Sequence, residues 1–384
     1  MNKKVVPILL AFLCMGFADA VGPFVGLAKA EFELSNFVAM LIPFMGFLMF
    51  GLLSVPMGIF QDKHSKKTTL IVGLLIALIG LSIPIFGLSH FSLFLLTVLL
   101  LGAGATILQV AGNPIMRDVS QEGKYSRNLS IGQFVKAIGS LAGPLIPAIA
   151  AAWFGADWKV IFPIFVGGIL ITLFSVLTTH VEESKEADQE PTTFSSSLSL
   201  LSNKYVAMMV FGIFIYVGAE VCMSSGIPLY LEDNFGVNIE KMGVLGTGLF
   251  FTTLMIGRFL GGVILNWIKP QKFFIITSIL GVIGILGLFV GTTTIAIISV
   301  IVIGLSFANV FPLIFSITVD HIPEKTNELS GLMVTAIVGG ALVPPLMGFV
   351  QDQTTVSLGF LVPLAAFVYI TYVAIKNLSI TEVE

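Results

Sequence analysis

Twelve long stretches of apolar residues, separated by short polar segments, run along the chain. They occupy residues 5–28, 37–60, 68–88, 91–115, 128–152, 159–180, 205–231, 242–267, 271–292, 294–318, 329–350 and 354–376. Each is close in length to the roughly 20 apolar residues that an α-helix needs to cross the hydrocarbon core of a bilayer. The pattern therefore predicts an all-α integral membrane protein with twelve transmembrane helices.

Lysine and arginine residues are concentrated in alternate segments between these stretches. With the N-terminus in the cytoplasm, 14 of the 19 basic residues fall in cytoplasmic segments and 3 on the opposite side, while Lys136 and Arg258 lie within apolar stretches. Cytoplasmic loops of membrane proteins carry an excess of basic residues. We therefore predict that both termini are cytoplasmic.

A polar segment divides the chain into two halves with six apolar stretches each. Residues 181–203 contain five acidic residues, a proline and a run of serines, which is typical of a solvated linker. We predict an N-terminal six-helix bundle in residues 1–180, a cytoplasmic linker in 181–203 and a C-terminal six-helix bundle in 204–384. The halves also correspond position by position, and the matched pairs, at offsets of 200 or 201, include Ser130 with Ser330, Gly139 with Gly339, and Asp19 with Glu220.

Composition and charge exclude several classes of protein. Hydrophobic residues make up 56% of the 384 residues, charged residues make up 11%, and the mean hydropathy is +1.01. Both cysteines, Cys14 and Cys222, lie in apolar stretches, which excludes a disulfide framework, and the four histidines form no metal-ligand cluster. A net charge of −3 without a basic block offers nothing to nucleic acid. No ATP-binding loop and no hydrolytic motif occurs, so we expect no cofactor, no metal and no enzymatic activity.

A glycine, an acid and a basic cluster follow the second apolar stretch. The segment from Gly58 through Asp62 to Lys66 and Lys67 resembles the loop signature of the major facilitator superfamily. Ordinary cytoplasmic charge explains the lysines but not the spacing from glycine to acid. An acid here can cap a neighbouring helix end or pair with a base in one conformation. We predict that Asp62 takes part in gating.

Several further segments resemble one branch of that superfamily, the fucose:proton symporter family. They are Leu108–Pro114, Tyr216–Glu220, Ile256–Phe259, Pro312–Ser316 and Gly339–Phe349, which are similar to its fourth, seventh, eighth, tenth and eleventh helices. The resemblance implies two pseudo-symmetric six-helix bundles, a sugar site near the bilayer midplane, alternating access, proton coupling and a monomer. Parallel repeats of this kind are typical of the superfamily.

The sequence departs from that family at positions that matter for coupling. A carboxylate of the family's fourth helix is replaced here by Gln109, which cannot titrate. The family's first-helix aspartate aligns near Gly22, whereas the acid present is Asp19, about one helical turn earlier. A glutamine of the family's sugar site matches Gln133, and the asparagine one turn later is replaced by Lys136.

Four charged residues lie within the apolar stretches, namely Asp19, Lys136, Glu220 and Arg258. A charge at membrane depth faces a cavity or a partner of opposite charge, because burying it alone is unfavourable by several kcal/mol or more. We predict that Asp19 and Glu220 couple transport to protons. Lys136 either contacts an acidic substrate or forms an internal ion pair with one of these two acids, and Arg258 has a gating or packing role.

Buried amides complete the candidate site. Gln109, Asn113, Gln133 and Asn309 lie within apolar stretches and suit a ligand rich in hydroxyl groups, and Tyr216 could stack on a sugar ring. The alternative for each is a hydrogen bond or packing contact between helices, and Asn113 could instead satisfy backbone freed by Pro114.

The leading hypothesis from the sequence is a secondary active transporter of the inner membrane that imports a sugar with protons. Lys136 favours an acidic sugar, such as a sialic acid or a hexuronate. The alternative is a symporter for a neutral hexose or deoxyhexose, with Lys136 in an internal salt bridge. A channel and a membrane enzyme are remote alternatives, because neither a selectivity filter nor a catalytic arrangement is visible.

Overall fold

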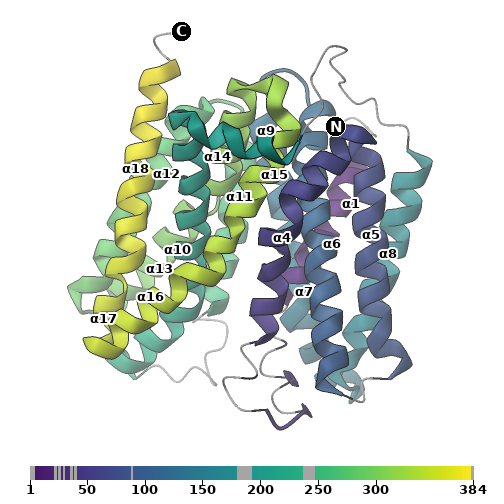
Figure 1. The fold of residues 1–384 in the computed structure, drawn as a ribbon. Coiled ribbons are helices and arrows are strands. Elements are labelled where there is room, and N and C mark those ends of the chain that lie inside the picture. The colour runs from purple at the N-terminus through teal and green to yellow at the C-terminus, as the bar shows by residue number, and fades with distance from the viewer. Residues whose placement is uncertain are drawn as a thin grey trace. The chain divides into compact units, whose positions relative to one another are not determined.

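The computed structural model describes residues 5–20, 24, 27–28, 31–34, 38, 41–87, 90–179, 193–236 and 247–381. Within these ranges every regular element is a helix (Figure 1). Nine helices in the described ranges are long and apolar enough to cross a membrane, and two shorter apolar helices are Val5–Asp19 and Leu249–Ile264. With α7 added, every predicted stretch contains a helix, although parts of the first, second, third, sixth and eighth stretches lie outside the described residues. The prediction of an all-α membrane protein is confirmed.

The helices follow one another along the chain with short connections. In the N-terminal half they are α1 (Val5–Gly16), the 3₁₀ turn η1 (Phe17–Ala20), α4 (Leu41–Lys63), α5 (Lys66–Ser82), α6 (Phe91–Asp118), α7 (Tyr125–Phe154) and α8 (Ile161–Thr178). The C-terminal half contains α10 (Lys204–Phe235), α11 (Thr247–Ile264), α12 (Pro270–Gly287), α13 (Thr293–Phe307), α14 (Val310–His321), α15 (Thr326–Thr335), η7 (Ala336–Val338), α16 (Gly339–Gln353), α17 (Val356–Gly359) and α18 (Leu361–Thr381).

Part of the predicted linker is helical. Residues 180–192 lie outside the described residues, but α9 spans Phe194–Ser199. Thr193 accepts a hydrogen bond from the backbone N–H of Ser196, and the Ser196 side chain accepts one from the backbone N–H of Thr193, which forms a capping box. The serine run thus begins a helix, because its hydroxyls satisfy N–H groups that lack partners at a helix start.

The tenth apolar stretch contains two helices instead of one. α13 ends at Phe307 and α14 begins at Val310. Pro312 has no backbone N–H, so it cannot bond to the carbonyl four residues earlier, at Ala308. A missing hydrogen bond and the proline ring explain why the helix breaks at this point.

The chain packs into two units. Unit 1 comprises 1–125, 135–200 and 322–335, and unit 2 comprises 126–134, 201–321 and 336–384. Each unit thus takes one short segment from the other half of the sequence. The division into two six-helix bundles at 181–203 remains a prediction.

In unit 1, α6 is largely buried. It packs against α4, α5 and α1, and α8 packs against α5 and α1 (Figure 1). Small residues of α6 allow close approach, and the aromatic rings of Phe17 and Phe165 stack with centroids 3.9 Å apart. Segment 322–335 adds α15, which packs on α4 and α6.

In unit 2, α10 packs against α16 and α18, α11 packs against α13, and α12 lies between α13 and α18. Phe307 and Phe367 stack with centroids 3.9 Å apart in the core of this unit, beside Tyr216 and Phe250.

The same close helix crossing occurs once in each unit. A Cβ on Gly139 would collide with the backbone oxygen of Leu13, and a Cβ on Gly339 would collide with that of Phe214. Gly139 and Gly339 are related by an offset of 200, and Leu13 and Phe214 by an offset of 201. The internal repeat inferred from the sequence therefore corresponds to a repeated contact between backbones.

Candidate functional site

A carboxylate, an ammonium, a hydroxyl and an amide meet inside unit 1. Asp19 lies in η1, Lys136 and Ser140 lie one turn apart on α7, and Gln109 lies on α6. The Lys136 ammonium is 3.4 Å from the Asp19 carboxylate, and the Ser140 hydroxyl donates to the same carboxylate oxygen over 2.8 Å. Lys136 also donates to Gln109 Oε1 at 3.5 Å, the outer limit of a hydrogen bond.

The two charges of this cluster differ in their contact with solvent. The Asp19 side chain is 40% exposed, whereas the Lys136 side chain is 13% exposed. The carboxylate therefore reaches solvent, while the ammonium depends on its protein partners. Of the two partners that the sequence proposed for Lys136 within the protein, the structure places Asp19 beside it.

Two amides that the sequence selected are buried with unpaired polar atoms. Asn113 on α6 is fully buried, and neither side-chain polar atom has a hydrogen-bond partner among the described residues. Gln133 on α7 is buried, and its Nε2 lacks a partner within the same described ranges. Because unpaired buried amides are unfavourable, these groups are available to a polar ligand or to water.

Unit 2 holds the second pair of membrane charges. Arg258 on α11 donates to the Glu220 carboxylate on α10 over 3.2 Å, with the side chains 10% and 19% exposed. Arg258 Nε has no hydrogen-bond partner in the part of the chain that the structure describes. The guanidinium is always charged, so it stabilises the ionised form of Glu220.

The other two site candidates in unit 2 form hydrogen bonds between helices. Tyr216 is fully buried and donates to the carbonyl oxygen of Phe307 over 2.8 Å, at the end of α13. Asn309, beside the helix break, donates to the carbonyl oxygen of Gly257 over 2.7 Å and lies against Gly261. For both residues this geometry matches the alternative to a substrate contact, which was a hydrogen bond or packing contact between helices. The substrate contacts predicted for them remain untested.

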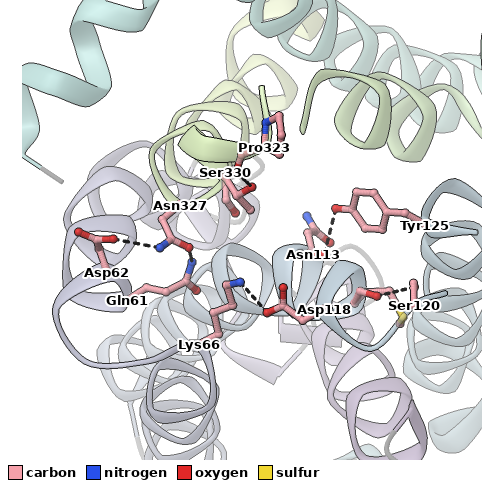
Figure 2. A network of polar contacts seen from close by, with 12 residues as sticks. Gln61, Asp62, Lys66, Asn113, Asp118, Ser120, Tyr125, Pro323, Asn327 and Ser330 are labelled. Atoms are coloured by element: carbon pink, nitrogen blue, oxygen red, sulfur yellow. Dashed lines mark hydrogen bonds and ion pairs between the residues drawn. The ribbon is translucent and has the colours of Figure 1, made fainter. Parts of the chain in front are cut away.

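Asp62 lies in a polar network at one end of unit 1. Asn327 of α15 donates to Asp62 over 3.1 Å and accepts from Gln61 over 2.8 Å, so one amide holds two residues of α4 (Figure 2). Nearby, Lys66 forms an ion pair with Asp118 at 2.5 Å, with the side chains 7% and 2% exposed. The end of α4 is therefore fastened to α15, and the start of α5 to the end of α6.

Residues 8–345 match the sequence profile of the Major Facilitator Superfamily. The chain belongs to the Major Facilitator Superfamily. It is accordingly a multi-pass membrane transporter and not an enzyme, as the sequence predicted.

Relatives and solved structures of superfamily members resemble nearly the whole chain. A glucose/galactose transporter of Brucella abortus biovar 1 (strain 9-941) is 29% identical over 356 residues, which cover 90% of this chain and 86% of that protein. The L-fucose-proton symporter of Escherichia coli (strain K12) is 24% identical over 375 residues, which cover 89% and 85%. The crystal structure of the transporter FucP in the outward conformation aligns with a TM-score of 0.85 and 23% identity, covering 98% of this chain and 99% of that one. This last comparison shows the shared fold.

One hydrogen bond supplies a donor to a backbone carbonyl of α6 that a proline leaves without its helical partner. Pro114 cannot bond to the carbonyl oxygen of Val110, four residues earlier. Ser330 of α15 is fully buried and donates its hydroxyl to that oxygen over 2.6 Å. The sequence analysis offered Asn113 for this task, but the Asn113 side chain makes no such bond among the described residues.

Sequence reasoning missed Ser140, Asn327, Ser330 and Asp118. Serines and asparagines are common in membrane helices, so nothing in the sequence distinguishes these from residues that bond to their own helix. Pro114 is the one signal that could have led to Ser330, because a proline in a membrane helix requires a donor for the carbonyl that it frees.

Proposed function

We propose that this transporter imports a neutral hexose or deoxyhexose together with protons, across the inner membrane and with both termini in the cytoplasm. The named activities of the relatives support a sugar, and the basic residues of the loops support the orientation. The observation that carries the coupling is the pair of Asp19 and Lys136, in which an accessible carboxylate neutralises a largely buried ammonium.

Protonation of Asp19 removes the negatively charged partner of the Lys136 ammonium. While Asp19 is ionised, it supplies the negative charge that keeps the ammonium favourable at membrane depth. When Asp19 takes up a proton, the ammonium loses this partner and requires new acceptors. Hydroxyl and ring oxygens of a sugar are such acceptors, so proton and sugar favour each other's binding on one carrier.

Glu220 remains a second candidate for proton coupling, with a weaker physical case. Its carboxylate accepts from the guanidinium of Arg258, which cannot release its proton. This permanent charge gives the Glu220 carboxylate a fixed partner within unit 2. We therefore propose Asp19 as the principal coupling group and the pair of Glu220 and Arg258 as a fixed element of unit 2.

A binding screen at two pH values tests this proposal. Glucose, galactose and fucose are compared with glucuronate and a sialic acid by thermal shift of the purified protein at pH 5.5 and 7.5. Neutral sugars are expected to stabilise the protein, and more strongly at pH 5.5, because protonation of Asp19 frees Lys136. Binding of acidic sugars alone would instead support the acidic-sugar transporter, with Lys136 paired to the substrate carboxylate.

Lys136→Ala is expected to weaken sugar binding about tenfold or more and to remove most of its pH dependence. A hydrogen bond to a charged donor contributes about 1.5–3 kcal/mol, and without the ammonium the protonation of Asp19 frees no donor. Lys136→Arg should recover part of both effects. Isothermal titration against pH measures them, with Lys159→Ala, an exposed lysine paired with Glu31, as the control. Unchanged pH dependence in Lys136→Ala would remove Lys136 from the coupling.

Asn327→Ala is expected to loosen α15 from α4 and to slow transport several-fold. The variant loses both bonds of Asn327, and two hydrogen bonds together contribute about 1–3 kcal/mol to the equilibrium between a fastened and a released α15. Asp62→Asn, which loses the charge but keeps an acceptor, should give a smaller effect. We propose on this basis that Asp62 acts as a latch.

A thiol reporter measures the latch directly. The backbone of Ser54 lies against Gly331 of α15, and the Ser54 side chain is buried. A cysteine introduced by Ser54→Cys should react faster with a maleimide in the Asn327→Ala background. Lys63→Ala, an exposed neighbour, serves as the control. Equal labelling rates and normal turnover in Asn327→Ala would rule the latch out.

A further inference from the structure

The hydroxyl of Ser140 lies between two acceptors. Its oxygen is 2.8 Å from the Asp19 carboxylate and 3.1 Å from the backbone carbonyl oxygen of Lys136. A serine hydroxyl carries one proton and two lone pairs, so it can donate to one of these acceptors at a time and can also accept. Rotation about the Cβ–Oγ bond turns this one proton from one acceptor to the other without movement of the helix.

We propose that Ser140 is a positioning residue for proton coupling, which satisfies the Asp19 carboxyl in both of its protonation states; the inference rests on the proposed role of Asp19. With Asp19 ionised, Ser140 donates to the carboxylate, beside the Lys136 ammonium. With Asp19 protonated, the new carboxyl O–H donates to Ser140 Oγ, and the Ser140 proton turns to the carbonyl oxygen of Lys136. In each state the hydroxyl proton of Ser140 has an acceptor, and in the protonated state the carboxyl proton of Asp19 has one as well.

The proton balance of this exchange is simple. A hydronium ion on the exposed side of Asp19 gives its proton to the carboxylate and leaves as water, forming one O–H bond and breaking one. Ser140 and Lys136 keep their own protons throughout. The hydroxyl only changes its acceptor, so the exchange needs no other reactant.

Few charged or polar groups of the described residues surround Asp19. From α7 it faces Lys136 and Ser140, and from α6 the cluster includes the uncharged Gln109. Within the described residues, Lys136 is the one charged side chain at ion-pair distance from Asp19. Ser140 therefore modifies a carboxyl whose charge is balanced by a single base.

Ser140→Ala tests the proposal by the pH dependence of binding and uptake. A bond to the ionised carboxylate is stronger than a bond between neutral groups, so its removal favours the protonated form. The pH at half-maximal sugar binding should move upward by about half a unit or more.

The pair Ser140→Thr and Ser140→Val separates the hydroxyl from the volume of the side chain. Threonine keeps the hydroxyl and valine replaces it by a methyl group of similar size. The pH profile should stay normal in the threonine variant and move in the valine variant. Ser82→Ala is the matched control, because the Ser82 hydroxyl donates only to the carbonyl oxygen of Leu78 on its own helix.

The outcomes distinguish this inference from the proposed function. A pH profile that moves in Ser140→Ala and Ser140→Val but not in Ser140→Thr or Ser82→Ala supports the positioning role. An unmoved profile in the alanine and valine variants, together with loss of pH dependence in Asp19→Asn, overturns the role of Ser140 and leaves proton symport intact. Retained pH dependence in Asp19→Asn overturns the coupling role of Asp19, on which the role of Ser140 rests.

Discussion

Asp19→Asn is expected to abolish accumulation of sugar against its gradient while leaving exchange across the membrane. A symporter that moves one proton per sugar can accumulate sugar about tenfold for each unit of pH difference across the membrane. The asparagine keeps the shape and can still accept from Ser140, but it cannot take up or release a proton. With two pH units imposed, the accumulation ratio should therefore fall from about one hundred to one.

Uptake and counterflow of radiolabelled sugar in proteoliposomes measure the two activities on one preparation. Asp157→Asn is the control, because that carboxylate lies in the exposed connection before α8, where it pairs with Lys159 at 3.6 Å. Concentrative uptake by the Asp19→Asn carrier would assign coupling elsewhere, first of all to Glu220.

Gly139→Ala and Gly339→Ala are expected to be strongly destabilising, although each adds only one methyl group. Each added Cβ would collide with a backbone oxygen of the facing helix, Leu13 in unit 1 or Phe214 in unit 2. A backbone carbonyl cannot turn aside as a side chain can, so the helices must separate. We expect a loss of about 2–3 kcal/mol for each variant, at the upper end of overpacking effects.

Two glycines elsewhere provide controls for this prediction. Added Cβ atoms on Gly167 of α8 and Gly348 of α16 would meet nothing within 4 Å. Alanine at these positions should leave stability unchanged or raise it by about 0.5–1 kcal/mol, since alanine favours helix. Thermal unfolding in detergent compares all four variants. Equal stability of the Gly139→Ala protein and the Gly167→Ala protein would contradict the backbone contact.

The fold was predictable from the sequence because each segment that crosses the bilayer needs a sufficiently long apolar helix. Apolar stretches of sufficient length locate the helices, and the matched glycines locate a crossing that recurs in each unit. Apolar length does not determine where a helix breaks or where a polar segment starts one, and local chemistry decides both. Pro312 divides the tenth stretch, and the capping box of Thr193 and Ser196 makes a helix within a segment whose composition indicated a linker.

The charged residues of the candidate site could be found from the sequence, but which of them form pairs could not. A charge within a membrane helix is visible in the sequence, and so Asp19, Lys136, Glu220 and Arg258 were found. Which acid neutralises Lys136 depends on helix packing, and one residue of register on α7 would have turned the ammonium away from Asp19. Ser140 was invisible for a similar reason, because only the packing of η1 on α7 gives its hydroxyl a second acceptor.

The most direct test of proton-coupled sugar import is the movement of protons when sugar is added. Proteoliposomes without any imposed gradient, in weakly buffered medium, are given a neutral sugar identified in the binding screen while the external pH is recorded. The medium should become more alkaline as sugar enters, by about one proton per sugar for a single coupling carboxyl, and Asp19→Asn should admit sugar without this change. Sugar entry through the unaltered protein with no change in external pH would contradict the account.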